Sequence, residues 1–436
     1  MKNYLINYSA NVAGVLLCSA VFSLTLRFGW PWPALKFFEL FTALFLAVLI
    51  FVILASIQAR SLIRNLGLHL RAAFTWLTLL ALSFVLGLFY SAIFLPEWRI
   101  YVSEVVLEYF RFMFVVAFFL GATCFLYLYP IWRKRVLATI MISPLVLWLS
   151  RIPIWSGLFF EIEDQRLRGP GNDPNYLGGW IALGLILSSA YFLYSKDRKR
   201  WLGLPLVATL TPLLLWTASR GAILSAAVAS LFLTVFYFRS SFLIHRKLLS
   251  SIWITGFLIL GVLLSWTSAS PEIRGAMLDR IVRPFTGSTS SVGMPSNESL
   301  DYLASGRDTL FLTGFKKFIS HPLGFGLAYH YWQPIMLASD GHKLGPHNLF
   351  LQVGLSGGYL GLIALLGFLA NILRYAKKIL IENDWESNGL IVCLIALLAN
   401  SLFLDTLTLR WLWLVISLIV SGLLLRRFDE AEDFRE

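Results

Sequence analysis

Long apolar stretches, separated by short polar connections, run through the whole chain. Twelve of them approach the length of about 20 residues that a helix needs to cross roughly 30 Å of hydrocarbon. Each stretch is predicted to be helical, because an unpaired backbone amide costs several kcal/mol in lipid. The predicted spans cover residues 9–26, 34–55, 72–95, 105–129, 136–150, 175–194, 202–218, 221–238, 249–266, 348–373, 389–404 and 411–425. The fifth and the seventh are short.

This pattern predicts an all-α polytopic membrane protein of about 12 transmembrane helices. One long connection divides it into helices 1–9 (residues 1–268), a loop domain (269–346), and helices 10–12 with a tail (347–436). The middle of the loop, 286–298, is rich in Ser, Gly, Thr and Pro and is predicted to be flexible. Its second part is predicted to be helical, because residues 305–308 have the form of a capping box and apolar residues follow at helical spacing. The segment 321–326 (HPLGFG) should end that helix.

Composition and charge agree with a membrane protein and indicate its orientation. Hydrophobic residues make up 58% of the chain and charged residues 14%, against roughly a quarter charged in soluble domains. Of the 36 Lys and Arg residues, 20 lie at one set of span ends, nine at the other and seven in the long loop. Both termini are therefore predicted to be cytoplasmic and the long loop to face outward. The net charge of +12 is explained by this topology, without nucleic acid as a partner.

Two smaller features complete the topology. The first span resembles a signal peptide, but Leu17 before Cys18 is not the small residue that cleavage usually needs, and we expect the span to be retained as an anchor. All three cysteines lie inside predicted spans, so packing is expected for them rather than a disulfide framework or a metal site.

Arg220 is the first candidate for chemistry at the outer face. It lies in the short turn between the seventh and eighth spans, where an arginine is costly unless it faces a partner or a wet cavity. Two simpler explanations stay open. The side chain could extend to the membrane surface, or it could pair with one of the acidic residues Glu104, Glu108 and Asp405.

Arg307 and His347 are the second and third candidates. Arg307 lies in the first turn of the predicted loop helix, where the helix dipole already disfavours a cation, which suggests a nearby anion. A solvated side chain or a pair with Asp301 or Asp308 is the alternative. His347 opens the tenth span, where the same dipole favours a neutral imidazole that can accept a proton. Alternatively, His347 only caps its helix.

Missing motifs narrow the chemistry further. The sequence contains no GxxxxGK[ST] motif, no HExxH and no cluster of carboxylates that suggests a metal, and no predicted cytoplasmic connection is long enough for a nucleotide-binding domain. We therefore expect no metal or other cofactor, and a substrate that arrives from the membrane or the outer space. Two arginines suit a diphosphate, and a neutral histidine suits activation of a hydroxyl group.

At these residues the sequence resembles the O-antigen ligase and polymerase superfamily of bacterial glycan assembly. The resemblance depends on four motifs in this order on one face, together with Asp173-Pro-Asn-Tyr176, and it covers about the C-terminal half. The motifs are TASRGAILS (217–225), SGRDTLF (305–311), HPLGFGL (321–327) and PHNLFLQVGLSGGYLG (346–361). One departure from the family pattern is Ser356, where members often carry Glu, so any role of that Glu is in doubt here.

The resemblance implies a fold like that of GT-C glycosyltransferases and transfer of a glycan from undecaprenyl diphosphate at the periplasmic surface of the inner membrane. In the ligase branch the acceptor is a sugar hydroxyl of lipid A–core. By similarity, Arg220 and Arg307 hold the diphosphate and His347 deprotonates the acceptor, with inversion at the anomeric carbon and without metal. Further substrate contacts are expected from Asn348, Asp173, Asn175, Arg166 and Arg168. Membrane lipids are the other expected partners, and the oligomeric state stays open.

Three alternatives to the ligase stay open. An O-antigen or exopolysaccharide polymerase, or a protein O-oligosaccharyltransferase, would use the same lipid-linked donor with another acceptor. A transporter of lipid-linked glycans belongs to a different class and often shows matching halves with broken helices near the bilayer midplane. No matching halves are visible here, and the unusual polar residues cluster at one surface.

Overall fold

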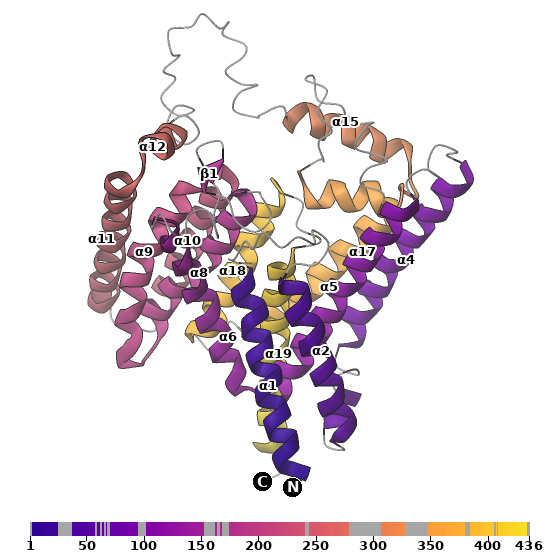
Figure 1. Cartoon of the computed structure of the whole chain (residues 1–436), viewed down its shortest axis with the longest axis horizontal. Coiled ribbons are helices and arrows are strands. Elements are labelled where there is room, and N and C mark those ends of the chain that lie inside the picture. Colours follow the sequence, from indigo (N-terminus) through magenta and orange to yellow (C-terminus); the bar gives the residue numbers. More distant parts are fainter. Residues whose placement is uncertain are drawn as a thin grey trace, which may run out of the picture.

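The protein is described by a computed structural model in which helices dominate (Figure 1). It describes residues 2–24, 37–56, 59–61, 63–64, 67, 70–94, 102–151, 162–163, 166–167, 174–239, 244–278, 307–327, 347–379, 384–404, 407 and 409–433. For some residues of these ranges the description covers the backbone alone. The segment 286–298, predicted to be flexible, lies outside them.

Each of the twelve predicted spans coincides with helical structure. The helices are α1 (Lys2–Ser23), α2 (Phe37–Ala55), α4 (Arg71–Phe94), α5 (Val102–Leu128), α6 (Ile131–Ile142), α8 (Pro174–Tyr194), α9 (Gly203–Trp216), α10 (Arg220–Arg239), α11 (Ile244–Ser268), α17 (Leu349–Ile379), α18 (Trp385–Ser401) and α19 (Arg410–Asp433). Within the described residues, eight helices are long and apolar enough to cross a membrane. The protein is thus a multi-pass helical membrane protein, and the number of twelve spans stays a prediction.

Two of the helices that fall short of that length, α6 and α9, lie at or contain a proline. In α6, the α-helix ends at Ile142 and continues as a 3₁₀ helix, η2 (Ser143–Arg151). Pro144 lies at this transition, where its ring has no N–H to donate and crowds the carbonyl of the preceding turn. Helix α9 has 14 residues and contains Pro212. At 1.5 Å per residue, 14 residues reach only about 21 Å.

Helix α8 is the centre of one part of the bundle. Helix α8 packs against α9, α10 and α18, and nearly all of its residues are buried. At the periphery, α11 exposes large apolar side chains such as Ile252 and Leu263, as expected for a helix that faces lipid. Further pairs are α1 with α2, α4 with α17, and α5 with α19.

The two ends of the bundle differ in what they carry. Helix α1 begins and α19 ends at the same end (Figure 1), here called the inner end. Helices α8, α10 and α17 begin at the opposite, outer end, where α12 (Pro271–Met277) and the loop helix α15 (Arg307–Ser320) also lie. A short antiparallel pair, β1 (Ile162–Glu163) and β2 (Arg166–Leu167), belongs to the connection before α8. This pair was not expected from the sequence.

Helix α17 changes direction at Gly358, whose φ of 61° and ψ of −155° are not helical. The segment 321–327 (HPLGFGL), here called the strap, follows α15 and lies against this break. Its Phe325 N donates to Leu355 O at 2.7 Å, its Gly326 N donates to Ser356 O at 2.8 Å, and Tyr359 N donates to Pro322 O at 2.9 Å. The strap thereby supplies hydrogen bonds that an unbroken helix would make within itself.

The strap also confirms the prediction that HPLGFG ends the loop helix. Gly324 and Gly326 both have positive φ, and α15 ends just before His321. A Cβ at Gly324 would lie 2.7 Å from Ser356 O, and one at Gly87 of α4 would lie 2.6 Å from the same atom. Glycine is needed here because backbone approaches backbone.

Gly358→Ala is expected to lower the melting temperature of the detergent-solubilised protein, with a loss of at least about 2 kcal/mol in unfolding free energy, because a positive φ opposes any side chain. The added Cβ would also lie 2.0 Å from Pro322 O. Gly256→Ala in α11 is the matched control, since nothing lies within 4 Å of its Cβ. Equal melting temperatures of G358A and G256A would contradict this account of the break.

Candidate functional site

Arg220 is held by a turn that is built from its own neighbours. Ala218 adopts a left-handed φ of 46°, which reverses the chain between α9 and α10. Ser219 then caps α10, because its Oγ accepts a hydrogen bond from Ala222 N at 3.3 Å. The same hydroxyl donates to Asn175 Oδ1 at 2.9 Å. Arg220 is therefore the first residue of a capped helix, is half-buried, and follows a residue anchored to the start of α8.

Glycines let three helix ends approach one another closely around Arg220. A Cβ at Gly178 of α8 would lie 2.8 Å from the Ala222 Cβ, and one at Gly179 would lie 2.9 Å from Asn400 Nδ2. A Cβ at Gly221 would lie 3.0 Å from Asn400 Oδ1. The last turn of α18, which carries Asn400, therefore contacts the starts of both α8 and α10.

His347 and Asn348 are attached to the same turn of α18. Asn348 caps α17, since its Oδ1 accepts from Leu351 N at 3.0 Å, and its Nδ2 donates to Leu402 O at 3.1 Å. His347 directly precedes this cap, is half-buried, and has a left-handed φ of 46°. The end of α18 thus joins the segment of Arg220 to the segment of His347, and this junction is here called the α18 hub.

The helix directions around the α18 hub favour an anion. Helices α8, α10 and α17 all begin there, and each helix start carries the positive end of a dipole and N–H groups without intrahelical partners. Such ends bind phosphate and other anions. Arg220 adds a formal positive charge at this place.

Two other arginines on the outer side, Arg410 and Arg111, are already paired with carboxylates. Arg410, at the start of α19, forms an ion pair with Glu39 of α2 and lies over the Phe38 ring. Burial lowers the pKa of Arg410 to about 10, which leaves it charged at neutral pH. Arg111 pairs with Glu108 one turn earlier in α5, so that carboxylate, an alternative partner for Arg220, has an arginine of its own. The side chain of Glu104 and all of Asp405 lie outside the described residues.

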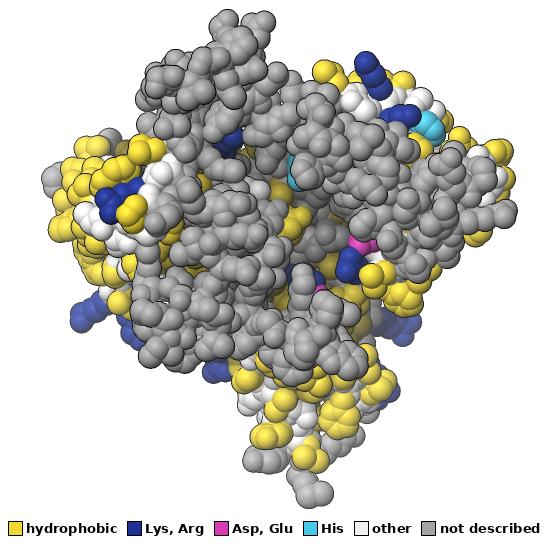
Figure 2. Space-filling model, turned by 45° about the horizontal axis from the view of Figure 1, so that its top comes forward, with side chains coloured by type: hydrophobic (Ala, Val, Ile, Leu, Met, Phe, Trp, Pro, Cys, Tyr) yellow, Lys and Arg dark blue, Asp and Glu magenta, His cyan; other side chains and the backbone are white. Residues whose placement is uncertain are grey.

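The remaining candidates are described only in part. Arg307 is the first residue of α15, as predicted, but its side chain lies outside the description. Arg166 belongs to β2, where its backbone lies opposite that of Glu163 in β1, but its side chain also lies outside the description. Arg168 and Asp173 lie outside the described residues. Figure 2, which brings the outer end forward, shows few charged side chains on this face among those described.

The sequence analysis missed Asn400 and Gln352. Asn400 is 3% exposed, and its Nδ2 has no hydrogen-bond partner within the described residues. Gln352 lies one turn after Asn348 in α17, is fully buried, and has both polar side-chain atoms unpartnered there as well. Buried polar groups are normally satisfied, and polar residues within a span are often functional. The signal that could have indicated Asn400 and Gln352 is a side-chain amide inside an otherwise apolar predicted span.

Comparison with known proteins agrees with these motifs. The sequence model of a family described as O-Antigen ligase matches residues 206–366. This region runs from α9 into α17 and includes Arg220, Arg307 and His347. A search of curated proteins finds no match to the chain. The predicted resemblance to the O-antigen ligase and polymerase superfamily is confirmed by the family match.

Ala218→Gly is expected to leave stability unchanged or to raise it by up to about 1 kcal/mol. Glycine removes the cost of a left-handed φ, roughly 1–2 kcal/mol, and part of this gain is lost to its greater freedom when unfolded. Ala222→Gly, four residues later and inside α10, should instead cost about 1 kcal/mol. Thermal unfolding in detergent compares the two variants. A similar loss in both would show that the turn carries no strain.

Proposed function

We propose that the protein is an O-antigen ligase, a proposal supported by the family match over residues 206–366. It transfers a glycan from undecaprenyl diphosphate to a sugar hydroxyl of lipid A–core at the periplasmic surface of the inner membrane. The supporting observation is the α18 hub, where the segments of Arg220 and His347 and three helix starts meet. In this assignment the outer end faces the periplasm.

The diphosphate of the donor binds at the α18 hub in this proposal. Arg220 contributes a guanidinium that can form two parallel hydrogen bonds to phosphate oxygens, and Arg307 of α15 contributes a second one. When the bond between the anomeric carbon and the diphosphate breaks, its electron pair leaves with the diphosphate. Cations and helix starts already aimed at that position stabilise this growing charge more than they stabilise the bound donor.

His347 acts as the general base in this proposal. The acceptor oxygen attacks the anomeric carbon from the side opposite the leaving group, which inverts the configuration, and the hydroxyl proton passes to the imidazole. The positive end of the α17 dipole disfavours a protonated imidazole before the reaction. The left-handed φ of His347 supports a functional role, since such conformations cluster at active sites.

The other candidates have supporting roles. Asn175 and Asn348 are tied to Ser219 and to Leu402, so they position the starts of α8 and α17 whether or not they also touch the substrate. We propose that Arg166, Arg168 and Asp173, in the connection before α8, contact sugars or acceptor phosphates. No metal takes part in this mechanism.

His347→Ala is expected to reduce transfer by 10²-fold or more, the usual range for loss of a general base. The assay uses purified protein, carrier-linked glycan and lipid A–core in the presence of a chelator. His245→Ala, at the other end of the bundle in the first turn of α11, is the matched control and should keep full activity. Near wild-type turnover of H347A would overturn the base assignment. Product formed only with a second carrier-linked glycan as acceptor would instead indicate a polymerase.

Arg220→Lys is expected to slow transfer by on the order of 10- to 100-fold, less than the 10²–10³ of losing a donor outright, because lysine keeps the charge but lacks the planar fork. Arg239→Lys, at the other end of the same helix, should leave the rate unchanged. The same reconstitution measures both rates. Equal rates for R220K and the wild type would show that Arg220 does not bind the diphosphate in a forked geometry.

A further inference from the structure

A pocket of about 790 Å³ opens at the inner end of the bundle, on the side away from the α18 hub. Its walls come from α6, α8, α9, the start of α18 and the connection that follows α8. Pockets of about 300–1,000 Å³ commonly hold small ligands. Its residues are Lys134, Ala138, Met141, Ile142, Tyr191, Tyr194, Ser195, Lys196, Asp197, Leu202, Leu206, Asp384 and Trp385. Nothing in the proposed transfer reaction uses this pocket.

One part of the pocket is apolar and opens toward the lipid-facing flank. Ala138, Met141 and Leu206 line it, and Ile142 and Leu202 are more than half exposed. Tyr191 and Trp385 pack edge to face, with ring centroids 5.0 Å apart, beside this surface. Aromatic rings of this kind are enriched where the hydrocarbon meets the headgroups. The pocket therefore lies where a lipid can enter from the side.

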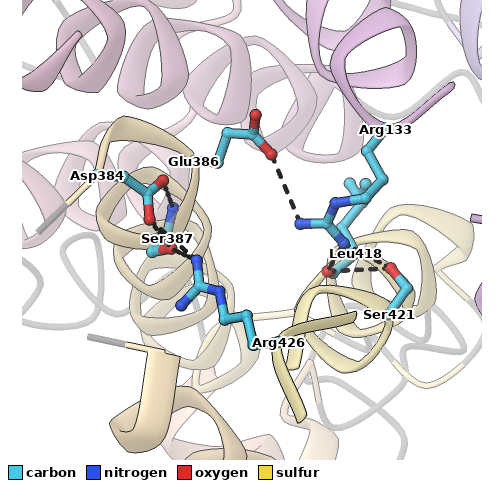
Figure 3. Close-up of polar contacts among 7 residues, drawn as sticks. All are labelled: Arg133, Asp384, Glu386, Ser387, Leu418, Ser421 and Arg426. Carbon is cyan, nitrogen blue, oxygen red and sulfur yellow. Dashed lines mark hydrogen bonds and ion pairs between the residues drawn. The ribbon is translucent and has the colours of Figure 1, made fainter. Parts of the chain in front are cut away.

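The two carboxylates in the pocket are already engaged. Asp384 caps α18 by accepting from Ser387 N at 3.0 Å and pairs with Arg426 of α19 at 3.0 Å. Asp197 accepts from Lys199 N at 3.0 Å and from Tyr191 OH at 3.5 Å. Figure 3 shows Arg426 directed at Asp384 and the first turn of α18.

A buried arginine fixes the wall that carries Asp384. Arg133 of α6 donates to Leu418 O at 2.6 Å and to Ser421 Oγ at 2.7 Å, and its second Nη lies 3.6 Å from Glu386 Oε2 (Figure 3). A Cβ at Gly422 would lie 2.7 Å from this guanidinium. The third nearby carboxylate, Glu386, is thus paired as well.

Lys134 and Lys196 are the cations that line the pocket, and because Asp384 is paired with Arg426, they outnumber the one carboxylate without an ion pair there, Asp197. Both are exposed, and within the described residues neither has a carboxylate at ion-pair distance. A phosphate supplies the negative charge that they lack, and acyl chains match the apolar part. Lysines at the inner end also lie at the cytoplasmic leaflet in the predicted topology, where acidic lipids attract basic side chains.

We propose that this pocket binds a phospholipid with an acidic headgroup. Its phosphate lies between the Lys134 and Lys196 ammonium groups, and an acyl chain lies along Met141, Ile142, Leu202 and Leu206. A bound lipid of this kind bridges α6, α8 and α9 at the inner end. This lipid site is separate from the proposed glycan-transfer site. The lipid proposal therefore does not depend on the proposed transfer activity.

The test is native mass spectrometry of the whole protein, released from detergent after titration with phosphatidylglycerol or phosphatidylcholine. The wild type should retain one phosphatidylglycerol more tightly than phosphatidylcholine. The double variant K134Q/K196Q should bind phosphatidylglycerol about tenfold or more weakly, given about 1 kcal/mol per lysine near acidic lipid. Lys377→Gln with Lys378→Gln is the matched control, since it removes two exposed charges at the same end but outside the pocket.

A second variant and a soluble probe make the result decisive. Ala138→Trp fills the apolar part without changing the charge, and it should also displace the lipid. Glycerol 1-phosphate carries the phosphate without chains and should compete only weakly; strong competition would indicate a site for a soluble phosphate and overturn the lipid assignment. Equal retention of the two lipids by the wild type, or an equal loss in K377Q/K378Q, would also overturn the proposal. If K134Q/K196Q fails to fold, the single variant Lys196→Gln and A138W decide.

Discussion

Backbone hydrogen bonding in a medium without water is the constraint on which the rest of this structure depends. It requires helices through the hydrocarbon, and it allows a break only where other groups in the protein satisfy the freed N–H and C=O groups. The break at Gly358 meets this condition, because the strap bonds to Leu355 O, Ser356 O and Tyr359 N. A segment more than 30 residues earlier in the chain therefore fixes the course of the helix that begins beside His347.

Strain and charge coincide at the outer end. Among the described residues, the non-glycine positions with positive φ are Ala218 and His347. One precedes Arg220 by two residues and the other is the proposed base. Both are held by side-chain caps, from Ser219 and from Asn348, and both caps are anchored to a second helix. Strain that the surrounding contacts maintain in this way is consistent with a rigid site for a charged substrate.

The sequence predicted the positions of the helices well but the contacts between them poorly. Apolar stretches located all twelve helices because the solvent leaves the backbone few choices. The α-helix of the fifth span nevertheless changes to a 3₁₀ helix next to Pro144, α9 has only 14 residues, and hydropathy does not fix how many helices cross the membrane. The HPLGFG motif predicted a turn, yet its three hydrogen bonds to α17 depend on a contact between distant segments. The α18 hub could not be predicted either. Gly178, Gly179 and Gly221 allow close approach of a neighbouring helix, and the sequence does not show which helix packs there.

Ser356 shows how packing limits the chemistry at this end. Its side chain is fully buried at the break in α17, its carbonyl accepts from the strap, and its Oγ has no hydrogen-bond partner within the described residues. The backbone around it is close, as the contacts of Gly87 and Gly324 with Ser356 O show. A carboxylate at this position would need a buried partner to offset its desolvation. Serine avoids that cost, and in the proposed reaction the acceptor proton passes to His347, just before the start of the same helix.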